Sequence, residues 1–205
     1  MRAKSYYVPI SEQSQKSYST DFKFSDQKYN SSVYNELMKD DHKERIFKDW
    51  IPESTQFYKL RNKYYQVKDS KVIFFCQWEL KYYSIFNRNC IEFEKIWRNT
   101  GQLESEKVPT NVFFELLFPT THIIMMDAEK TEDGLRFWDN MVGKAFRKGL
   151  NIYYIKLLAP NKQLVKINIP SDYSKYWDIA HGIENKYQAQ RFIITDIELE
   201  ESKVI

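Results

Sequence analysis

The chain has 205 residues, which suggests one domain or a compact domain with an attached subdomain. Its 31 Lys and Arg residues nearly balance 28 Asp and Glu residues, so it lacks the basic excess typical of proteins that bind a phosphate backbone. No segment approaches the roughly 20 apolar residues of a membrane span. We therefore expect neither nucleic acid nor a membrane as its partner.

The first 100 residues contain no glycine, which excludes glycine-rich phosphate loops from that half of the chain. The N-terminal segment also lacks an apolar core of signal-peptide length, so we expect a cytoplasmic protein. Cys76 and Cys90 lie among apolar residues and are expected to be small buried hydrophobes. The HExxH, CxxC and GxSxG patterns are missing, and the sequence predicts neither a metal site nor a cofactor.

Residues 1–70 are predicted to form an irregular α+β arm that packs on the rest of the molecule. Ser31 or Ser32 is the expected N-terminal cap of its helix, and Pro52 is expected to end that helix. In chain order, the predicted elements are a short strand near Tyr6–Ile10, a helix over residues 31–50 and a strand over residues 56–67.

Basic and aromatic residues alternate in the last of these segments. Lys59, Arg61 and Lys63 are interleaved with three tyrosines. Such a pattern is typical of surfaces on which single-stranded nucleic acid stacks, but also of an edge strand protected by lysines. We prefer the second interpretation. The tyrosines are Tyr58, Tyr64 and Tyr65.

Residues 71–205 are predicted to form a single Rossmann-like α/β domain with three layers and a mixed, mostly parallel sheet. Strand and helix patterns alternate between residues 71 and 158, which is typical of βαβ units. The predicted strands are Lys71–Trp78, Thr121–Asp127, Asn151–Leu158, Gln163–Ile169 and Arg191–Ile197, and the predicted helices are Glu79–Arg98, Leu135–Lys148 and one that starts at Pro170.

The loop after the strand Thr121–Asp127 is the expected ligand site, because ligands bind beyond the carboxyl ends of parallel strands. Asp127 could accept a hydrogen bond from a ribose, and Thr131 or the Gly134 amide could contact a phosphate at the helix N-terminus. The alternative is structural: Thr131 or Asp133 caps the helix, and Gly134 relaxes the turn.

The stretch DAEKTEDGLRFW, which begins at Asp127, and the downstream KAFRKGLNIYYI carry a resemblance to a known family. They resemble the sugar–base site of nucleoside deoxyribosyltransferase-like Rossmann domains. The resemblance covers residues 71–158, mainly 121–156, and implies a Rossmann fold with a cleft for a nucleoside. It would make Asp127 the strand-end acid, Gly134 the loop glycine and Phe137 the helix aromatic residue.

The chain departs from this family at the catalytic position. The family's glutamate follows the loop glycine by four residues, where this chain has Trp138, with Asp139 one step further. Leu135 replaces the family's threonine. Without the glutamate a glycosyl intermediate has no nucleophile, which leaves Asp127 and Asp139 as the candidate catalytic groups.

Two functions are consistent with these patterns. The preferred one is a non-catalytic cytoplasmic binding protein that acts on a protein partner, as an inhibitor, immunity or antitoxin-type accessory factor of bacterial or phage origin. Its aromatic-rich surface is expected within the first 70 residues. The alternative is a nucleotide- or nucleoside-handling enzyme, for glycosyl transfer or hydrolysis, with its site at the Asp127–Gly134 loop. The oligomeric state does not follow from the sequence.

Overall fold

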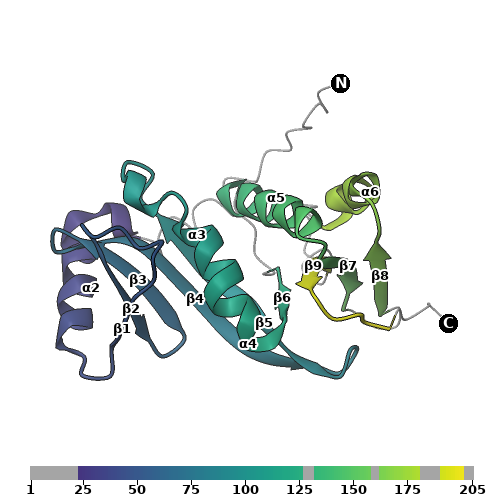
Figure 1. Cartoon of the computed structure of the whole chain (residues 1–205), viewed down its shortest axis with the longest axis horizontal. Coiled ribbons are helices and arrows are strands. Elements are labelled where there is room, and N and C mark those ends of the chain that lie inside the picture. The colour runs from purple at the N-terminus through teal and green to yellow at the C-terminus, as the bar shows by residue number, and fades with distance from the viewer. Residues whose placement is uncertain (1–22, 127–131, 158–161, 181–189, 201–205) are drawn as a thin grey trace.

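The computed structural model describes residues 23–126, 132–157, 162–180 and 190–200. Nine strands of this part form one sheet in the order β1-β2-β3-β4-β5-β6-β9-β7-β8 (Figure 1). The strands are β1 (Glu44–Ile46), β2 (Gln56–Leu60), β3 (Lys63–Lys68), β4 (Lys71–Tyr83), β5 (Arg88–Arg98), β6 (Ile123–Met125), β7 (Asn151–Lys156), β8 (Gln163–Ile167) and β9 (Gln190–Thr195).

Helices flank this sheet, and one helical segment is continuous through three types of helix. That segment runs through α3 (Val108–Asn111), the π-helical η3 (Val112–Leu117) and α4 (Phe118–Thr121). The other helical elements are the short η1 (Lys23–Ser25) and η2 (Leu103–Ser105), and the helices α2 (Gln27–Lys39), α5 (Glu132–Arg147) and α6 (Pro170–Ala180).

Strands β1 to β5 form an antiparallel meander, in which each strand pairs with the next along the chain. The predicted helix over Glu79–Arg98 is wrong, because this segment is the second half of β4, a turn and β5. The apolar residues of this segment are spaced as in a helix, although a turn separates the two strands. Asn87 in that turn adopts a φ of 51°. The segment is rich in aromatic and β-branched residues, which favour strands.

The C-terminal half has the element order β6-α5-β7-β8-α6-β9. The predicted strand–helix–strand unit of β6, α5 and β7 is present, but β9 lies between its two strands and runs antiparallel to both. The sheet is therefore mostly antiparallel, and only β5 and β6 pair in parallel. The predicted Rossmann-like, mostly parallel sheet is wrong, because alternating strands and helices do not specify which strand enters between them.

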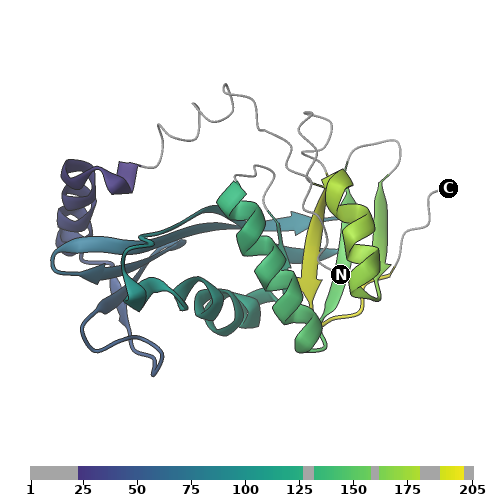
Figure 2. The ribbon, with the colours of Figure 1, turned by 90° about the horizontal axis from the view of Figure 1, so that it is seen from above.

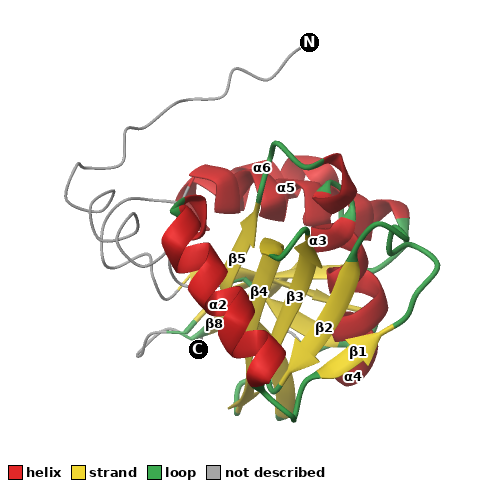
Figure 3. Cartoon of the chain, turned by 90° about the vertical axis from the view of Figure 1, so that its left-hand side faces the viewer, coloured by secondary structure: helices red, strands yellow, loops and turns green. Residues whose placement is uncertain are grey.

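Helices cover both faces of the first half of the sheet. Figure 3 shows α2 against one face and the α3–α4 segment behind the sheet. Phe24 and Leu37 belong to the buried cluster under α2. The larger cluster lies on the other face and continues beneath α5 and α6, which cross that face next to each other (Figure 2).

The helix predicted over Leu135–Lys148 is confirmed as α5, and its C-terminal stop is the expected glycine. Gly149 adopts a φ of +69°. The amide of Gly149 donates to the Phe146 carbonyl at 3.1 Å, and that of Leu150 donates to the Ala145 carbonyl at 3.0 Å. This pair of bonds is the Schellman arrangement, which satisfies carbonyls at the helix end.

Helix α2 begins and ends earlier than predicted. Its cap is Asp26, whose carboxylate accepts the Tyr29 amide at 2.9 Å, whereas Ser31 and Ser32 lie inside the helix. Serine and aspartate are similarly good caps, so composition alone does not choose between these positions. The helix ends at Lys39, and β1 occupies part of the range predicted as helix.

Candidate functional site

The predicted ligand loop is described only in part. Asp127 and Thr131 lie outside the described residues. Asp133 and Gly134 are in the first turn of α5, and Asp139 lies further along the same helix. Among the described residues, α5 begins at Glu132, and β6, the strand before this stretch, pairs antiparallel with β9. The assignment of these residues to a ligand stays a prediction.

Asp139 faces helix α6. The Tyr173 hydroxyl donates a hydrogen bond to Asp139 Oδ1 at 3.2 Å. Desolvation raises the pKa of Asp139, and the hydrogen bond from Tyr173 opposes that rise. The ring of Tyr173 packs on Phe192 of β9 with a centroid distance of 4.6 Å. The pair therefore joins α5 to α6 and to the sheet.

Trp138, which the sequence resemblance would place at a catalytic glutamate's position, is a core residue. It is 2% exposed, and its ring meets those of Phe93 and Phe113 edge-on, with centroid distances of 5.9 and 5.8 Å. Phe137 packs against the same Phe93 ring at 5.8 Å. A carboxylate at position 138 would be buried among aromatic rings, which is costly without a partner.

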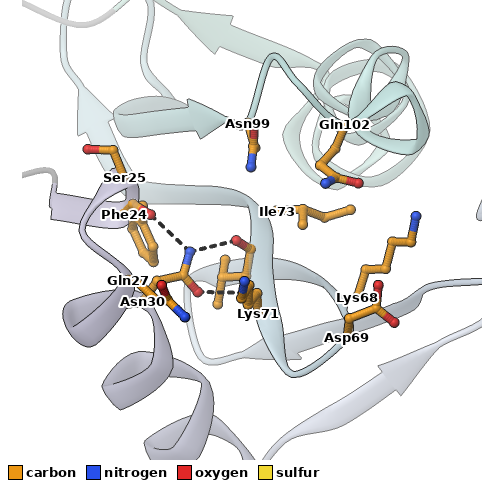
Figure 4. Close-up of a pocket in the computed structure, with 11 residues that line it drawn as sticks. Phe24, Ser25, Gln27, Asn30, Lys68, Asp69, Lys71, Ile73, Asn99 and Gln102 are labelled. Atoms are coloured by element: carbon orange, nitrogen blue, oxygen red, sulfur yellow. Dashed lines mark hydrogen bonds between the residues drawn. The ribbon is translucent and has the colours of Figure 1, made fainter.

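A hollow of about 320 Å³ lies between the start of α2 and the turn that joins β3 to β4 (Figure 4). Its wall includes Asn30, whose Nδ2 donates to the carbonyls of Phe24 at 3.0 Å and of Val72 at 2.8 Å. Lys68, also in the wall, forms an ion pair with Glu104 at 2.6 Å. Both of these side chains are therefore engaged by groups of the protein itself.

A buried charge network links β4, β5 and β9. The Glu92 carboxylate, 7% exposed, forms ion pairs with Arg191 and with Lys81, whose Nζ is 3.2 Å from Glu92 Oε2. The Tyr83 hydroxyl donates to the same Oε2 at 2.7 Å. Burial and the adjacent Glu92 raise the pKa of Tyr83. The sequence carried no signal for this network, because its members are far apart along the chain.

The tyrosines of the basic–aromatic segment point into the protein. Tyr58, Tyr64 and Tyr65 are 8%, 5% and 6% exposed. β2 is not an edge strand, since it pairs with β1 and β3, so the preferred interpretation of this segment is also wrong. Three buried rings are not a stacking surface for single-stranded nucleic acid.

Within the described residues, the part of β4 beyond β3 has a free edge. The β3–β4 pairing ends where the Trp78 amide donates to the Asn62 carbonyl at 3.1 Å and the Asn62 side chain donates to the Trp78 carbonyl at 2.6 Å. From Glu79 to Tyr83, β4 pairs with β5 alone among the described residues. Figure 1 shows this hairpin extending away from β1, β2 and β3.

Backbone groups alternate in direction along β4, and this alternation determines which of them lie on the free edge. Trp78 directs its amide outward, so the backbone groups of Leu80 and Tyr82 also point away from β5. Their side chains are 49% and 61% exposed. Sequence reasoning placed the aromatic surface before residue 70, where Phe47, 74% exposed, is one exposed aromatic side chain. It missed the β4 edge because this segment was assigned to a helix.

Within the described parts of the chain, no three His, Cys, Asp or Glu side chains gather as ligands for a metal ion. Every helix in those parts is too short or too polar to cross a bilayer. Cys76 and Cys90 are both fully buried, as predicted, and burial raises the pKa of each thiol. No protein-family model matches the chain, and no curated protein matches it significantly.

Proposed function

We propose that this chain is a non-catalytic binding protein whose β4 edge takes up an extended segment of a protein partner. The observation that carries the proposal is the free edge from Glu79 to Tyr83, which has exposed apolar side chains beside it. A strand with unpaired backbone groups is a template for another chain. Addition of a strand to such an edge is a recurrent mode of peptide recognition.

The backbone and the side chains of this edge would act together. Leu80 and Tyr82 each offer one amide and one carbonyl, and each new hydrogen bond contributes about 0.5–1.5 kcal/mol. The Tyr82 ring supplies the kind of side chain that anchors interfaces. On the opposite face Glu79 and Lys81 pair with each other at 2.9 Å, so the charged residues there are already engaged.

The core position of Trp138 favours binding over glycosyl chemistry, because an aromatic packing residue stands where the resemblance would require a nucleophilic glutamate. A small protein that occupies a partner through a strand edge fits an inhibitor, immunity or antitoxin-type role. The proposal requires the partner to provide an extended segment with an unpaired edge of its own.

A photo-crosslinking experiment in the native host tests the proposal. Benzoylphenylalanine in place of Tyr82 should yield one discrete cross-linked protein, whereas the same group in place of Leu103, 82% exposed in a different element, should not. Equal products from both positions would contradict a specific site. A cross-link to a second copy of this chain would contradict a separate partner and show that the edge mediates self-association.

A pair of substitutions at Leu80 then separates backbone pairing from side-chain contact. Leu80→Pro removes an outward amide and leaves the β5 pairing intact, as proline is tolerated on a free edge. Leu80→Thr removes the apolar side chain and keeps the amide. We expect the proline variant to lose the cross-link from Tyr82 and the threonine variant to retain part of it. Strand addition is refuted if the proline variant cross-links as the parent does.

A further inference from the structure

The last turn of helix α5 and the residue directly after it present three cations. Lys144, Arg147 and Lys148 are spaced by three and four residues, which places them side by side on a helix. The Arg147 side chain lies along the helix, with Nη1 3.7 Å from the point where a Cβ on Gly143 would be. Arg147 and Lys148 are exposed, and Lys144 is half-buried.

The segment α3–η3 brings a fourth cation to the same place. Lys144 Nζ donates to Thr110 Oγ1 at 2.8 Å, and Lys107 lies one helical turn before Thr110. One turn after Thr110, the Phe114 ring lies beneath Lys148, whose Nζ is 5.4 Å from the ring centroid. Two helical segments, distant in sequence, thus join at one basic surface.

These four positive charges are not neutralised. In the described part of the chain no carboxylate forms an ion pair with Lys107, Lys144, Arg147 or Lys148. Desolvation lowers the pKa of Lys144, and the charges of Arg147, Lys107 and Lys148 lower it further. The negative end of the α5 dipole accounts for cations in its last turn, but not for Lys107 at the start of α3.

The segment that carries Phe114 is a π-helix, which is rare and recurs at functional sites. We propose that Lys107, Lys144, Arg147 and Lys148 form a binding site for a compact, multiply charged phosphate group such as the pyrophosphate or triphosphate of a small molecule. The site is separate from the β4 edge and does not depend on it. Phosphate oxygens would supply the anionic partners that the four side chains lack, through charge-assisted hydrogen bonds.

The compact arrangement of the four cations favours a small phosphate ligand over a nucleic acid strand. A strand follows an extended basic groove, whereas here the cations gather around one lysine at the junction of two helical segments. The chain as a whole has a net charge of only +3, so the basic surface is local.

Calorimetric titration of the full chain with tripolyphosphate at low salt tests this site. We expect saturable binding that Lys144→Gln and Lys107→Gln each weaken about tenfold, since each removes one charged contact. Lys48→Gln is the matched control, because it removes the same charge from an exposed loop residue elsewhere. Equal weakening by the control would overturn the site in favour of a general charge effect.

Two further measurements keep the proposal falsifiable. The side-chain pKa of Lys144, followed by carbon NMR of its Cε, should rise when tripolyphosphate is added and should not rise with chloride at equal ionic strength. An unchanged pKa would contradict contact at this lysine. Binding of single-stranded DNA through the same residues, with no binding of tripolyphosphate, would also overturn the proposal.

Discussion

The side chain of Asn30 pairs with both backbone groups of Val72. Asn30 Nδ2 donates to the Val72 carbonyl at 2.8 Å, and Asn30 Oδ1 accepts the Val72 amide at 2.7 Å. Val72 is fully buried and Asn30 is 6% exposed, so the amide replaces a neighbouring strand at the start of β4. Helix α2 is thereby fixed to the sheet by hydrogen bonds as well as by apolar contacts.

Asn30→Ala should destabilise the protein by about 2–3 kcal/mol, because the substitution leaves a buried amide and a buried carbonyl of Val72 without partners. Urea unfolding measures the change. Asn35→Ala is the control, since Asn35 is exposed on the same helix and should change the free energy of unfolding by less than about 0.5 kcal/mol. Alanine is the better helix former at both positions, so a loss for Asn30→Ala no larger than that for Asn35→Ala would contradict the pairing with Val72.

Gly143 inside α5 and Gly149 just beyond its C-terminus should respond to alanine with opposite signs. Gly143 is inside the helix, and an added Cβ would lie 3.7 Å from Arg147 Nη1, an ordinary contact. Gly143→Ala should therefore raise the free energy of unfolding by about 0.5–1 kcal/mol. Gly149 has a φ of +69°, so Gly149→Ala should lower it by about 1 kcal/mol. Thermal unfolding of both variants provides the comparison, and a common sign would contradict the assigned cap.

Substitutions of Glu92 and Arg191 should have non-additive effects on the free energy of unfolding. Glu92→Leu removes the carboxylate that pairs with Arg191, whose side chain is 12% exposed, and should cost about 3–5 kcal/mol. Replacing both residues by leucine should cost less than the sum of the single losses, since the second substitution removes the uncompensated charge. A double-mutant cycle measured by denaturant unfolding tests this. Additive losses would mean that Lys81, not Arg191, dominates the environment of Glu92.

Stability should fall in alkaline solution as buried tyrosines ionise. Burial raises the pKa of Tyr64 and of Tyr65 from the usual 10.0 to about 12. A raised folded-state pKa means that their contribution is complete below pH 10 and is lost as the pH rises from 10 to about 12. Denaturant unfolding across this range should show the loss. The double variant Tyr64→Phe and Tyr65→Phe should lose less stability over the same interval, and an identical profile would refute the assignment.

Elements whose patterns are local were predictable from the sequence. The helix of α5 follows from an apolar stripe and ends at Gly149, whose positive φ no other residue type adopts as easily. The strands near residues 123, 151, 163 and 190 were also found. In each case the residues that determine the element lie within it or directly after it.

Long-range pairing was not predictable. The insertion of β9 between β6 and β7 depends on contacts between residues 34 to 72 positions apart, and no local pattern encodes them. The β4–β5 hairpin was missed because aromatic residues at three- and four-residue steps are compatible both with a helix and with a twisted hairpin. That error concealed the free edge of β4, which a correct strand assignment would have made visible.

The position of β9 also fixes an order of events during synthesis. Strands β1 to β5 pair only with their neighbours in sequence, so this half of the sheet is complete once residue 98 has left the ribosome. β6 and β7 emerge earlier than the strand that joins them, and their facing edges stay open until residues 190–195 arrive. The nascent chain therefore carries two unpaired edges while the residues between β7 and β9 are synthesised, and unpaired strand edges are templates for aggregation.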